Sequence, residues 1–311
     1  MLRSKPILAL SLLCVALAPS APAQRSPARA HASATESSGP VAETGTLTFK
    51  YITIIYPGAN ITEPLGISNK GVIVGGLSSG SSSGFVWRNG IIAGFNPFYD
   101  TVLAGMNSSG EVVGSDEPNL GRDPPQGFLL NNGKFTALNV PGVTGTIPQG
   151  ISDAGSVVGE YYDNNSPDSS WQGFLYSGGT FTTLDFPGAE ITEARGVNNQ
   201  GQIAGLYEDS FGTQYSFIYS NGLFQQLVVP GCVDSGALGI NNNGDVVGFC
   251  ETSREGFGYL YKDGTFTFLS APEGFGRTLA AGVNDNDEVV GYYAPPGSYN
   301  IYYGFLAVPT N

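Results

Sequence analysis

The chain consists of short apolar runs separated by polar turns rich in asparagine and glycine. In the clearest example, the apolar run that ends at Gly239 and Ile240 is followed by the turn Asn241–Gly244, and Val246 and Val247 begin the next apolar run. Two short apolar runs on either side of an Asn/Gly turn predict a β-hairpin. Five further copies of this pattern begin at Gly66, Gly105, Gly150, Gly196 and Gly282.

Each hairpin is followed by a third apolar run, and in the first five copies a glycine turn and a fourth short run come next. Phe181–Pro187 is an example of the fourth run, and its proline suits a strand end because proline cannot donate to a ladder. The repeating unit is therefore predicted to have four strands. The third runs are Gly84–Trp87, Gly127–Leu130, Gly173–Tyr176, Ser216–Tyr219, Gly258–Tyr261 and Gly304–Ala307.

The copies follow one another at intervals of 39, 45, 46, 43 and 43 residues. A period of about 40 to 50 residues with four strands per unit is typical of a β-propeller blade. An open solenoid of stacked sheets is the competing architecture.

The two ends of the repeat region favour the propeller. The sixth copy stops at Asn311, where its fourth strand should begin, whereas Tyr51–Thr62 aligns residue for residue with Phe181–Thr192. A first strand that completes the last blade closes the ring and removes exposed sheet edges. We therefore predict an all-β fold, a six-bladed β-propeller of four-stranded blades whose ring is closed by the N-terminal strand.

A glycine stands at the same position of all six predicted first strands. Glycine inside a strand is unfavourable by roughly 0.5–1 kcal/mol relative to alanine, so its repetition indicates a backbone that needs the space, or a bulge repeated in every blade. Before this glycine, Gln149 and Arg195 are polar where other copies have leucine or alanine. They either line a central channel or point outward at a strand end.

The first residues have the pattern of a secretory signal peptide. Arg3 and Lys5 supply a basic start, Ile7–Leu17 an apolar core and Ala21–Ala23 a small-residue cleavage site. We expect residues 1–23 to be removed and the protein to be secreted, to the periplasm or the extracellular space.

The remaining chain divides into two parts. Residues 24–44 are rich in Ala, Ser, Pro and Thr without an apolar period, which predicts a disordered tether. Residues 45–311 hold all six repeats and are expected to form a single propeller domain. No run in them approaches the roughly 18 apolar residues that span a bilayer, so we expect no membrane insertion. We also expect a monomer.

The charge of the chain excludes one class of partner. The net charge is −13, and it becomes −15 when Arg3 and Lys5 leave with the signal peptide. An anionic surface repels phosphate backbones and anionic lipids, so nucleic acid is not expected as a partner.

The repeat resembles the HAF-type extracellular repeat proteins of bacteria. That family carries a Gly-Ile-Asn-x-x-Gly-x-Val-Val-Gly hairpin followed by a His-Ala-Phe-Leu-Trp-like strand, and the likeness covers about residues 45–311. Here Gln126 and Gly127 precede Phe128 where the family has His-Ala, and no copy contains histidine. The resemblance implies a secreted propeller-type repeat and no particular activity.

Few residues suited to catalysis occur in the predicted domain. The one histidine, His31, falls in the tether, so Ser-His-Asp and Cys-His arrangements cannot form, and zinc lacks its usual ligands. Asn284–Glu288 looks like the start of a calcium loop, but it lacks the required glycine and distant glutamate, and it is predicted to be a hairpin turn. No catalytic residue, metal site or cofactor is predicted.

Aromatic and acidic residues gather directly after the second strand of several blades. Equivalent positions in a ring lie on one face, where such residues could stack on sugar rings or hold a cation. The alternative is that the aromatic residues pack between blades and the acids are solvated. The candidate ligand-binding residues are Tyr161, Tyr162, Asp163, Tyr207, Glu208 and Glu251.

Three functions stay open on this basis. The first is a binding or recognition scaffold for a glycan or another extracellular protein, since recognition usually resides in loops on a rigid scaffold. The second is a carboxylate-based glycosidase or lyase, because two acids suffice for glycoside hydrolysis. The third is a structural component of the cell envelope.

Cys232 and Cys250 are the cysteines left after signal removal, and secretion favours their oxidation. If the hairpin turns at Asn242 and Asn243, Cys250 lies opposite Ser235, three residues from Cys232. We predict a disulfide between the two cysteines, and the alternative is two buried thiols.

Overall fold

The structure is a computed structural model that describes residues 47–79, 82–98, 100–116, 123–164, 171–271, 277–298 and 300–310. The predicted signal peptide (1–23), the tether (24–44) and His31 lie outside the described residues. Leu47–Asn311 forms one compact unit. Within the described ranges the regular elements are all β-strands. The same ranges contain no helix long and apolar enough to cross a membrane.

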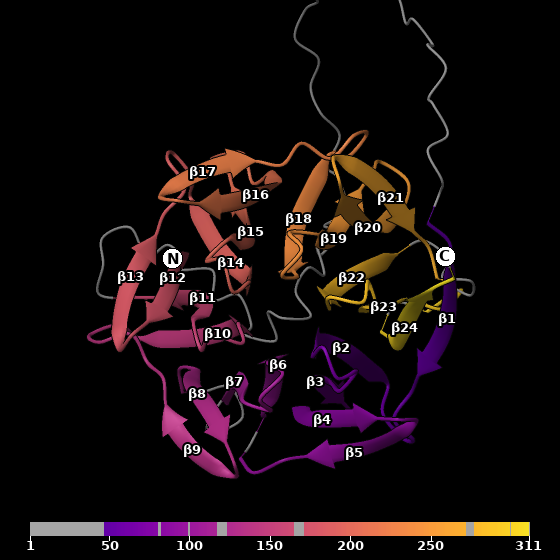
Figure 1. Ribbon diagram of the computed structural model, residues 1–311, viewed down its shortest axis with the longest axis horizontal. Coiled ribbons are helices and arrows are strands. Elements are labelled where there is room, and N and C mark those ends of the chain that lie inside the picture. The colour runs from indigo at the N-terminus through magenta and orange to yellow at the C-terminus, as the bar shows by residue number, and fades with distance from the viewer. Residues whose placement is uncertain are drawn as a thin grey trace, which may run out of the picture. The chain divides into compact units, whose positions relative to one another are not determined.

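The unit is a six-bladed β-propeller, as predicted, with six four-stranded antiparallel sheets arranged in a ring (Figure 1). Each blade begins with an inner strand and continues outward. The strands of blades 1 to 3 are β2 (Ile61–Ile67), β3 (Ile73–Ser78), β4 (Ser82–Arg88) and β5 (Ile91–Phe95); β6 (Val102–Met106), β7 (Val112–Asp116), β8 (Gln126–Asn131) and β9 (Lys134–Ala137); β10 (Gly145–Ile151), β11 (Val157–Tyr162), β12 (Trp171–Ser177) and β13 (Thr180–Leu184).

The strands of blades 4 and 5 are β14 (Ile191–Val197), β15 (Ile203–Glu208), β16 (Gln214–Ser220) and β17 (Leu223–Gln226); β18 (Asp234–Ile240), β19 (Val246–Glu251), β20 (Gly256–Lys262) and β21 (Thr265–Leu269). Blade 6 combines the two ends of the unit. Its strands are β22 (Thr278–Val283), β23 (Val289–Tyr293), β24 (Tyr303–Pro309) and, on the outside, β1 (Phe49–Ile54).

The pairing of β1 with β24 confirms the predicted closure of the ring. The two strands run antiparallel from Phe49 opposite Pro309 to Ile54 opposite Gly304. Without this pair β24 would present an unpaired edge, so the closure satisfies the backbone groups of the last blade.

The glycine of each inner strand is explained by both of its predicted causes. A Cβ atom added to Gly150 would lie 2.6 Å from the carbonyl oxygen of Arg195 and 3.1 Å from the Cα of Gly196 in the next blade. The other five inner glycines meet the backbone of the following blade in the same way. The strand register also shifts just before each of them, for example between Pro148 and Gly150. The inner strands therefore touch at a ring of six glycines, each preceded by a bulge.

A second glycine, in the second strand of each blade, makes room for the aromatic ring of the third strand. A Cβ atom on Gly159 would lie 2.8 Å from Cε1 of Phe174, which is fully buried. Gly205 faces Phe217 in the same way at 2.5 Å. These rings fill the core between blades, which explains why the Val-Val-Gly and Gly-Phe motifs recur together.

The recurrent asparagine of the hairpin motif shapes the turn and also links the blades. In blade 5, Oδ1 of Asn241 accepts hydrogen bonds from the backbone N–H groups of Asn243 and Asp245. Its Nδ2 donates to the carbonyl oxygen of Asn284 in blade 6 at 3.1 Å. Asn284 shapes its own turn in the same way, so the segment Asn284–Glu288 is the predicted hairpin turn.

Candidate functional site

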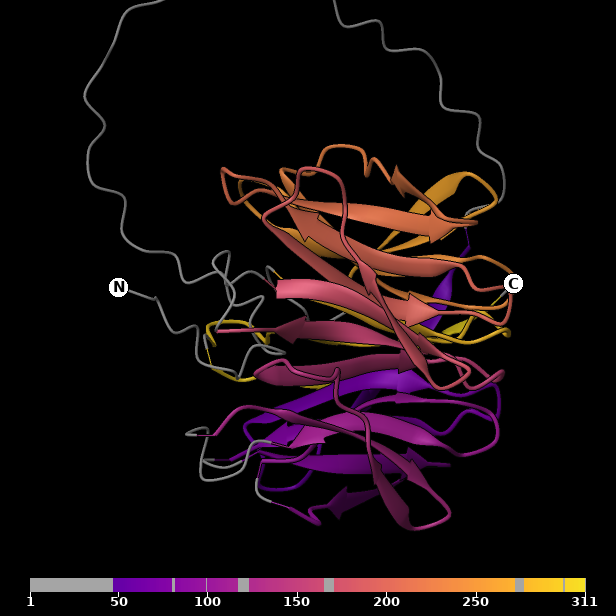
Figure 2. The same cartoon turned by 90° about the vertical axis from the view of Figure 1, so that its left-hand side faces the viewer.

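The propeller axis has two chemically different ends, which Figure 2 shows on opposite sides of the blades. We call the end formed by the turns between first and second strands the turn end. The other end, where the chain leaves each second strand, is the loop end. The glycine ring separates them, because it lies between the turns and the loop-end residues of every inner strand.

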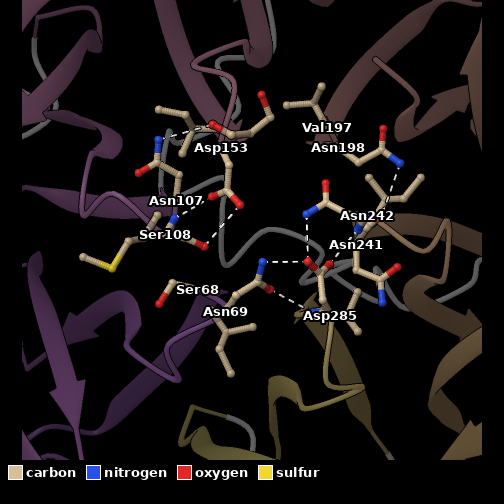
Figure 3. A pocket seen from close by; sticks show the side chains of 16 residues that line it. Ser68, Asn69, Asn107, Ser108, Asp153, Val197, Asn198, Asn241, Asn242 and Asp285 are labelled. Carbon is tan, nitrogen blue, oxygen red and sulfur yellow. Dashed lines mark hydrogen bonds between the residues drawn. The ribbon is translucent and has the colours of Figure 1, made fainter. Parts of the chain in front are cut away.

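The turn end holds a depression of about 60 Å³, large enough for a few water molecules (Figure 3). Its apolar residues directly follow the ring glycines, and its polar residues come from the hairpin turns. The residues that line it are Ile67, Ser68, Asn69, Met106, Asn107, Ser108, Ile151, Ser152, Asp153, Val197, Asn198, Ile240, Asn241, Asn242, Val283 and Asp285.

The polar groups of this depression are engaged with one another. Asp285 accepts hydrogen bonds from the backbone N–H and Nδ2 of Asn242 and from Nδ2 of Asn69. Asp153 accepts from the backbone N–H and the hydroxyl of Ser108 (Figure 3). Each carboxylate thus links its own blade to a neighbouring blade. Both therefore have a structural role.

The loop end carries a cluster of charged groups between blades 3 and 4. Glu193 and Arg195 lie on β14, just before its ring glycine, and the guanidinium of Arg195 donates to Oε2 of Glu193 through both Nε and Nη2. Glu160 on β11 lies 4.0 Å from Arg195 Nη2 and accepts a hydrogen bond from Nε2 of Gln149 at 3.3 Å. Arg195 and Gln149 occupy the bulges of β14 and β10. Their side chains therefore turn toward other polar groups near the axis instead of pointing outward.

The position of this cluster follows from its contact with a distant blade. Arg195 of blade 4 is close enough to Tyr292 of blade 6 for the phenol to affect the guanidinium electrostatically. Blade 5 separates these residues around the ring, so they approach each other near the axis. We call Gln149, Glu160, Glu193 and Arg195 the axial cluster.

Burial and a neighbouring negative charge favour the protonated form of Glu160. The pKa of Glu160 is raised to about 8, first by burial and then by the charge of Glu193 and a hydrogen bond between the two carboxyl groups, while Arg195 and Gln149 oppose the shift. A protonated Glu160 beside the ion pair of Glu193 and Arg195 leaves the set with little net charge, which is the form that a buried site favours.

Glu63 of blade 1 is a second buried carboxyl group near the axis. It precedes its ring glycine by three residues, as Glu193 does, and it is 6% exposed. Burial raises the pKa of Glu63 to about 7. Its Oε1 has no hydrogen-bond partner among the described residues. Such a group is costly unless a donor reaches it.

The predicted aromatic and acidic residues of blade 3 contact groups in their own blade. The hydroxyl of Tyr161 donates to Oε1 of Gln172 and also lies 2.9 Å from the hydroxyl of Thr183. The ring of Tyr162 packs on Trp171 at a centroid distance of 4.6 Å. Asp163 accepts a hydrogen bond from the hydroxyl of Thr144.

The predicted residues of blade 4 contact both their own blade and the segment that joins it to blade 3. Tyr207 stacks on Phe186 with ring centroids 3.7 Å apart and nearly parallel planes, and Tyr215 lies 5.2 Å from it. Glu208 accepts a hydrogen bond of 3.5 Å from Nε2 of Gln214.

Glu251, the last predicted residue of this face, forms an ion pair with Arg277 at 3.1 Å. Its pKa is raised by burial and by the charge of Asp234, while Arg277 opposes the shift. All six predicted residues lie at the loop end, where second strands finish, and each set has partners of its own.

Cys232 and Cys250 are joined by a disulfide in the structure, with Cα atoms 5.3 Å apart. Cys250 lies opposite Ser235, in the predicted register. The bond ties the loop before β18 to the second strand of blade 5.

Sequence reasoning noted Gln149 and Arg195 but missed Glu63, Glu160 and Glu193. The signal that could have identified them is departure from the repeat. The positions of Glu63 and Glu193 hold Val102, Ile147, Gly236 and Leu279 in the other blades, and the position of Glu160 holds Gly76, Ser115, Leu206, Phe249 and Tyr292. The described residues contain no group of three or more His, Cys, Asp or Glu side chains placed to hold a metal ion.

Comparisons with known proteins bear on the fold. Neither a family model nor a curated protein matches the chain, so the resemblance to the HAF-type family stays a prediction. A gluconolactonase from Xanthomonas campestris is similar in structure, with 11% identity over 88% of this chain and 99% of that one and a TM-score of 0.50. A protein of unknown function from Dyadobacter fermentans shares 10% identity over 83% and 98% of the two chains at a TM-score of 0.52.

A six-bladed fucose-recognising lectin from Aleuria aurantia matches at 12% identity over 85% of this chain and 96% of that one, with a TM-score of 0.48. At such identities a likeness concerns the fold alone. The function has to be argued from the site.

Proposed function

We propose that this protein is a secreted recognition scaffold that binds a polar extracellular ligand, a glycan, at the loop end of its axis. The observation that carries the proposal is where the repeat breaks. At the turn end the six blades contribute mostly small polar residues, whereas at the loop end Glu63, Glu160, Glu193 and Arg195 stand where other blades have uncharged residues.

The energetics of buried charges favour a functional reason for these charged residues. Buried ion pairs are often neutral or unfavourable for stability compared with apolar residues of similar volume. Five of the six blades fold with leucine, alanine or glutamine at the position of Arg195, so the fold does not need the guanidinium. A charged cluster that does not serve the fold is a candidate for recognition.

The test is a variant that restores the repeat. Gln149→Leu, Glu160→Leu, Glu193→Ile and Arg195→Leu place in blades 3 and 4 the residues that other blades hold at equivalent positions. We expect the wild type to retain a ligand on a glycan array, and the variant to bind that ligand at least about tenfold more weakly while melting at the same or a higher temperature.

The matched control is Glu190→Gln with Glu255→Gln, which changes two exposed acids and should leave binding unchanged. Equal binding by the repeat-restoring variant would place the site elsewhere. An array without any ligand for the wild type would refute glycan recognition.

A second candidate is a carboxylate-based enzyme, which the Glu160–Glu193 pair favours because one carboxyl holds a proton beside another that pairs with Arg195. Hydrogen-bonded carboxyls lie closer than the roughly 5 Å of a retaining glycosidase, so the pair suits a lyase better. Release of unsaturated products from the array ligand, lost in Glu160→Gln, would establish this function.

A further inference from the structure

The axial cluster is mostly buried, which limits the size of the ligand group that can reach it. What we infer about that group rests on the proposed function. The side chains of Glu193 and Arg195 are 16% and 11% exposed, and that of Glu160 is 4% exposed. At these exposures solvent reaches only a small part of the cluster, so it can receive one small group of a ligand but not a whole sugar ring. The rest of the ligand would lie on the loop end outside the cluster.

The cluster has two carboxyl groups and one cation. Arg195 directs Nε and Nη2 to Glu193, and its 4.0 Å distance from Glu160 exceeds hydrogen-bonding range. Glu160 has the neutral amide of Gln149 as its hydrogen-bond donor. A second positive charge would therefore find an unmatched carboxyl group at Glu160.

The groups that face Glu160, which lies on β11, come from two other strands. Gln149 belongs to β10, and Glu193 and Arg195 belong to β14. Within the described part of the chain, Arg195 is the one cationic side chain among them. The net charge of −13 adds a long-range attraction for cations.

We propose that the axial cluster binds a positively charged amino group of the ligand, as in an amino sugar, and places it against Glu160 and Glu193 in preference to a neutral hydroxyl or amide. The ammonium enters with its charge, Glu160 gives up its proton to the solvent, and no other bond changes. A neutral group leaves the proton on Glu160 in place and gains only a hydrogen bond. Binding of the amine is thus coupled to release of one proton.

The experiment compares two disaccharides that differ in one functional group, chitobiose with free amino groups and N,N′-diacetylchitobiose. Isothermal titration of the mature chain in two buffers of different ionisation enthalpy gives both the affinity and the number of protons released. We expect the amino form to bind at least about tenfold more tightly and to release about one proton at pH 6, where the sugar amine is largely charged and Glu160 still holds its proton.

Two variants separate this site from general attraction to an acidic surface. Glu160→Gln should lose the preference and the proton release, whereas Glu190→Gln, an exposed change, should keep both. A preference that survives Glu160→Gln, equal affinity for the two sugars, or binding of neither would overturn the inference. The proposed function would stand in each case if the glycan array still yields a ligand that the repeat-restoring variant fails to bind.

Discussion

Asn284 in the last blade donates a hydrogen bond from Nδ2 to the carbonyl oxygen of Ser68 in the first blade, at 3.2 Å. Beside it the backbone N–H of Asp285 donates to Oδ1 of Asn69. On the outer side of the same junction β1 pairs with β24. The ring is therefore closed both at the axis and at the rim, by segments far apart in the sequence.

The first prediction tests the closure at the rim. Deleting residues 24–60 removes β1 and leaves β24 with an unpaired edge, so we expect a lower melting temperature, a broader transition and aggregation. Deleting residues 24–44 is the control and should change none of these properties. Calorimetry of the two truncated proteins is the measurement. If the longer deletion melts as sharply and at as high a temperature as the full chain, the outer closure does not stabilise the ring.

The second prediction concerns the glycine ring. Gly150→Ala would place Cβ 2.6 Å from the carbonyl oxygen of Arg195, so the backbone of blade 4 would have to shift, and we expect a loss of about 1–3 kcal/mol. Gly76→Ala is the control, because its Cβ would lie 3.8 Å from Val102 in ordinary contact. Urea unfolding of both variants measures the difference, and equal stabilities would mean that the inner strands can separate freely.

The sequence predicted the blades because each structural demand occurs six times. The ring glycine and the aromatic residue of the third strand serve the same contact in all six blades. The turn asparagine does so in four blades, and serine takes its place in blades 1 and 3. The register of Cys250 was also correct, although two deviations from the assumed hairpin cancel. The turn pairs Ile240 with Val246, one residue later than expected, and the bulge before Gly239 restores the register.

Departures from the repeat mark the members of the axial cluster in the sequence, but their contacts with one another could not be predicted. Whether Glu160 meets Arg195 depends on which way a bulge turns a side chain and on which blade lies next to it. Neither is expressed in the local pattern of one repeat. The tyrosines of the loop end were noticed because aromatic residues stand out in a sequence, and the stacking of Tyr207 on Phe186 depends on a contact between two blades.

The third prediction concerns the disulfide. Thiol titration of the secreted chain, denatured without reductant, should find no free sulfhydryl at Cys232 or Cys250. Replacing both residues with serine opens a loop with a sequence separation of 18, and the chain-entropy model gives a loss of about 3 kcal/mol. Two titratable thiols in the oxidised preparation would contradict the bond.

The fourth prediction separates packing from recognition at the loop end. Tyr207→Ala removes the stack on Phe186 and should destabilise the protein by about 1 kcal/mol or more, whereas Tyr207→Phe keeps the ring and should be close to neutral. Phe174→Ala removes a fully buried ring and should lower the free energy of unfolding by about 3–5 kcal/mol. If Tyr207→Ala keeps full stability and weakens the array ligand, Tyr207 is a recognition residue and not a packing residue.

The last prediction uses Glu63, whose pKa rises from 4.5 to about 7 on folding because the side chain is buried. Because the pKa of Glu63 is higher in the folded state, its protonation stabilises the folded state, and this stabilisation is complete below pH 4.5. It is lost as the pH rises through about 7, which lowers the free energy of unfolding by roughly 3 kcal/mol at most. Glu63→Gln has the shape of the protonated acid and no titration. We therefore expect the variant to equal the wild type near pH 4.5 and to melt at a higher temperature at pH 8.

The wild type also contains Glu160, whose own raised pKa lowers its stability over an overlapping range, so the informative quantity is the difference between variant and wild type at each pH. That difference isolates Glu63, because Glu160 is present in both proteins. Glu190→Gln, at an exposed position, should show no such pH-dependent difference. A gap between Glu63→Gln and the wild type that is the same at pH 4.5 and pH 8 would mean that Glu63 titrates in the folded protein as it does in the unfolded chain, and that a donor reaches Oε1.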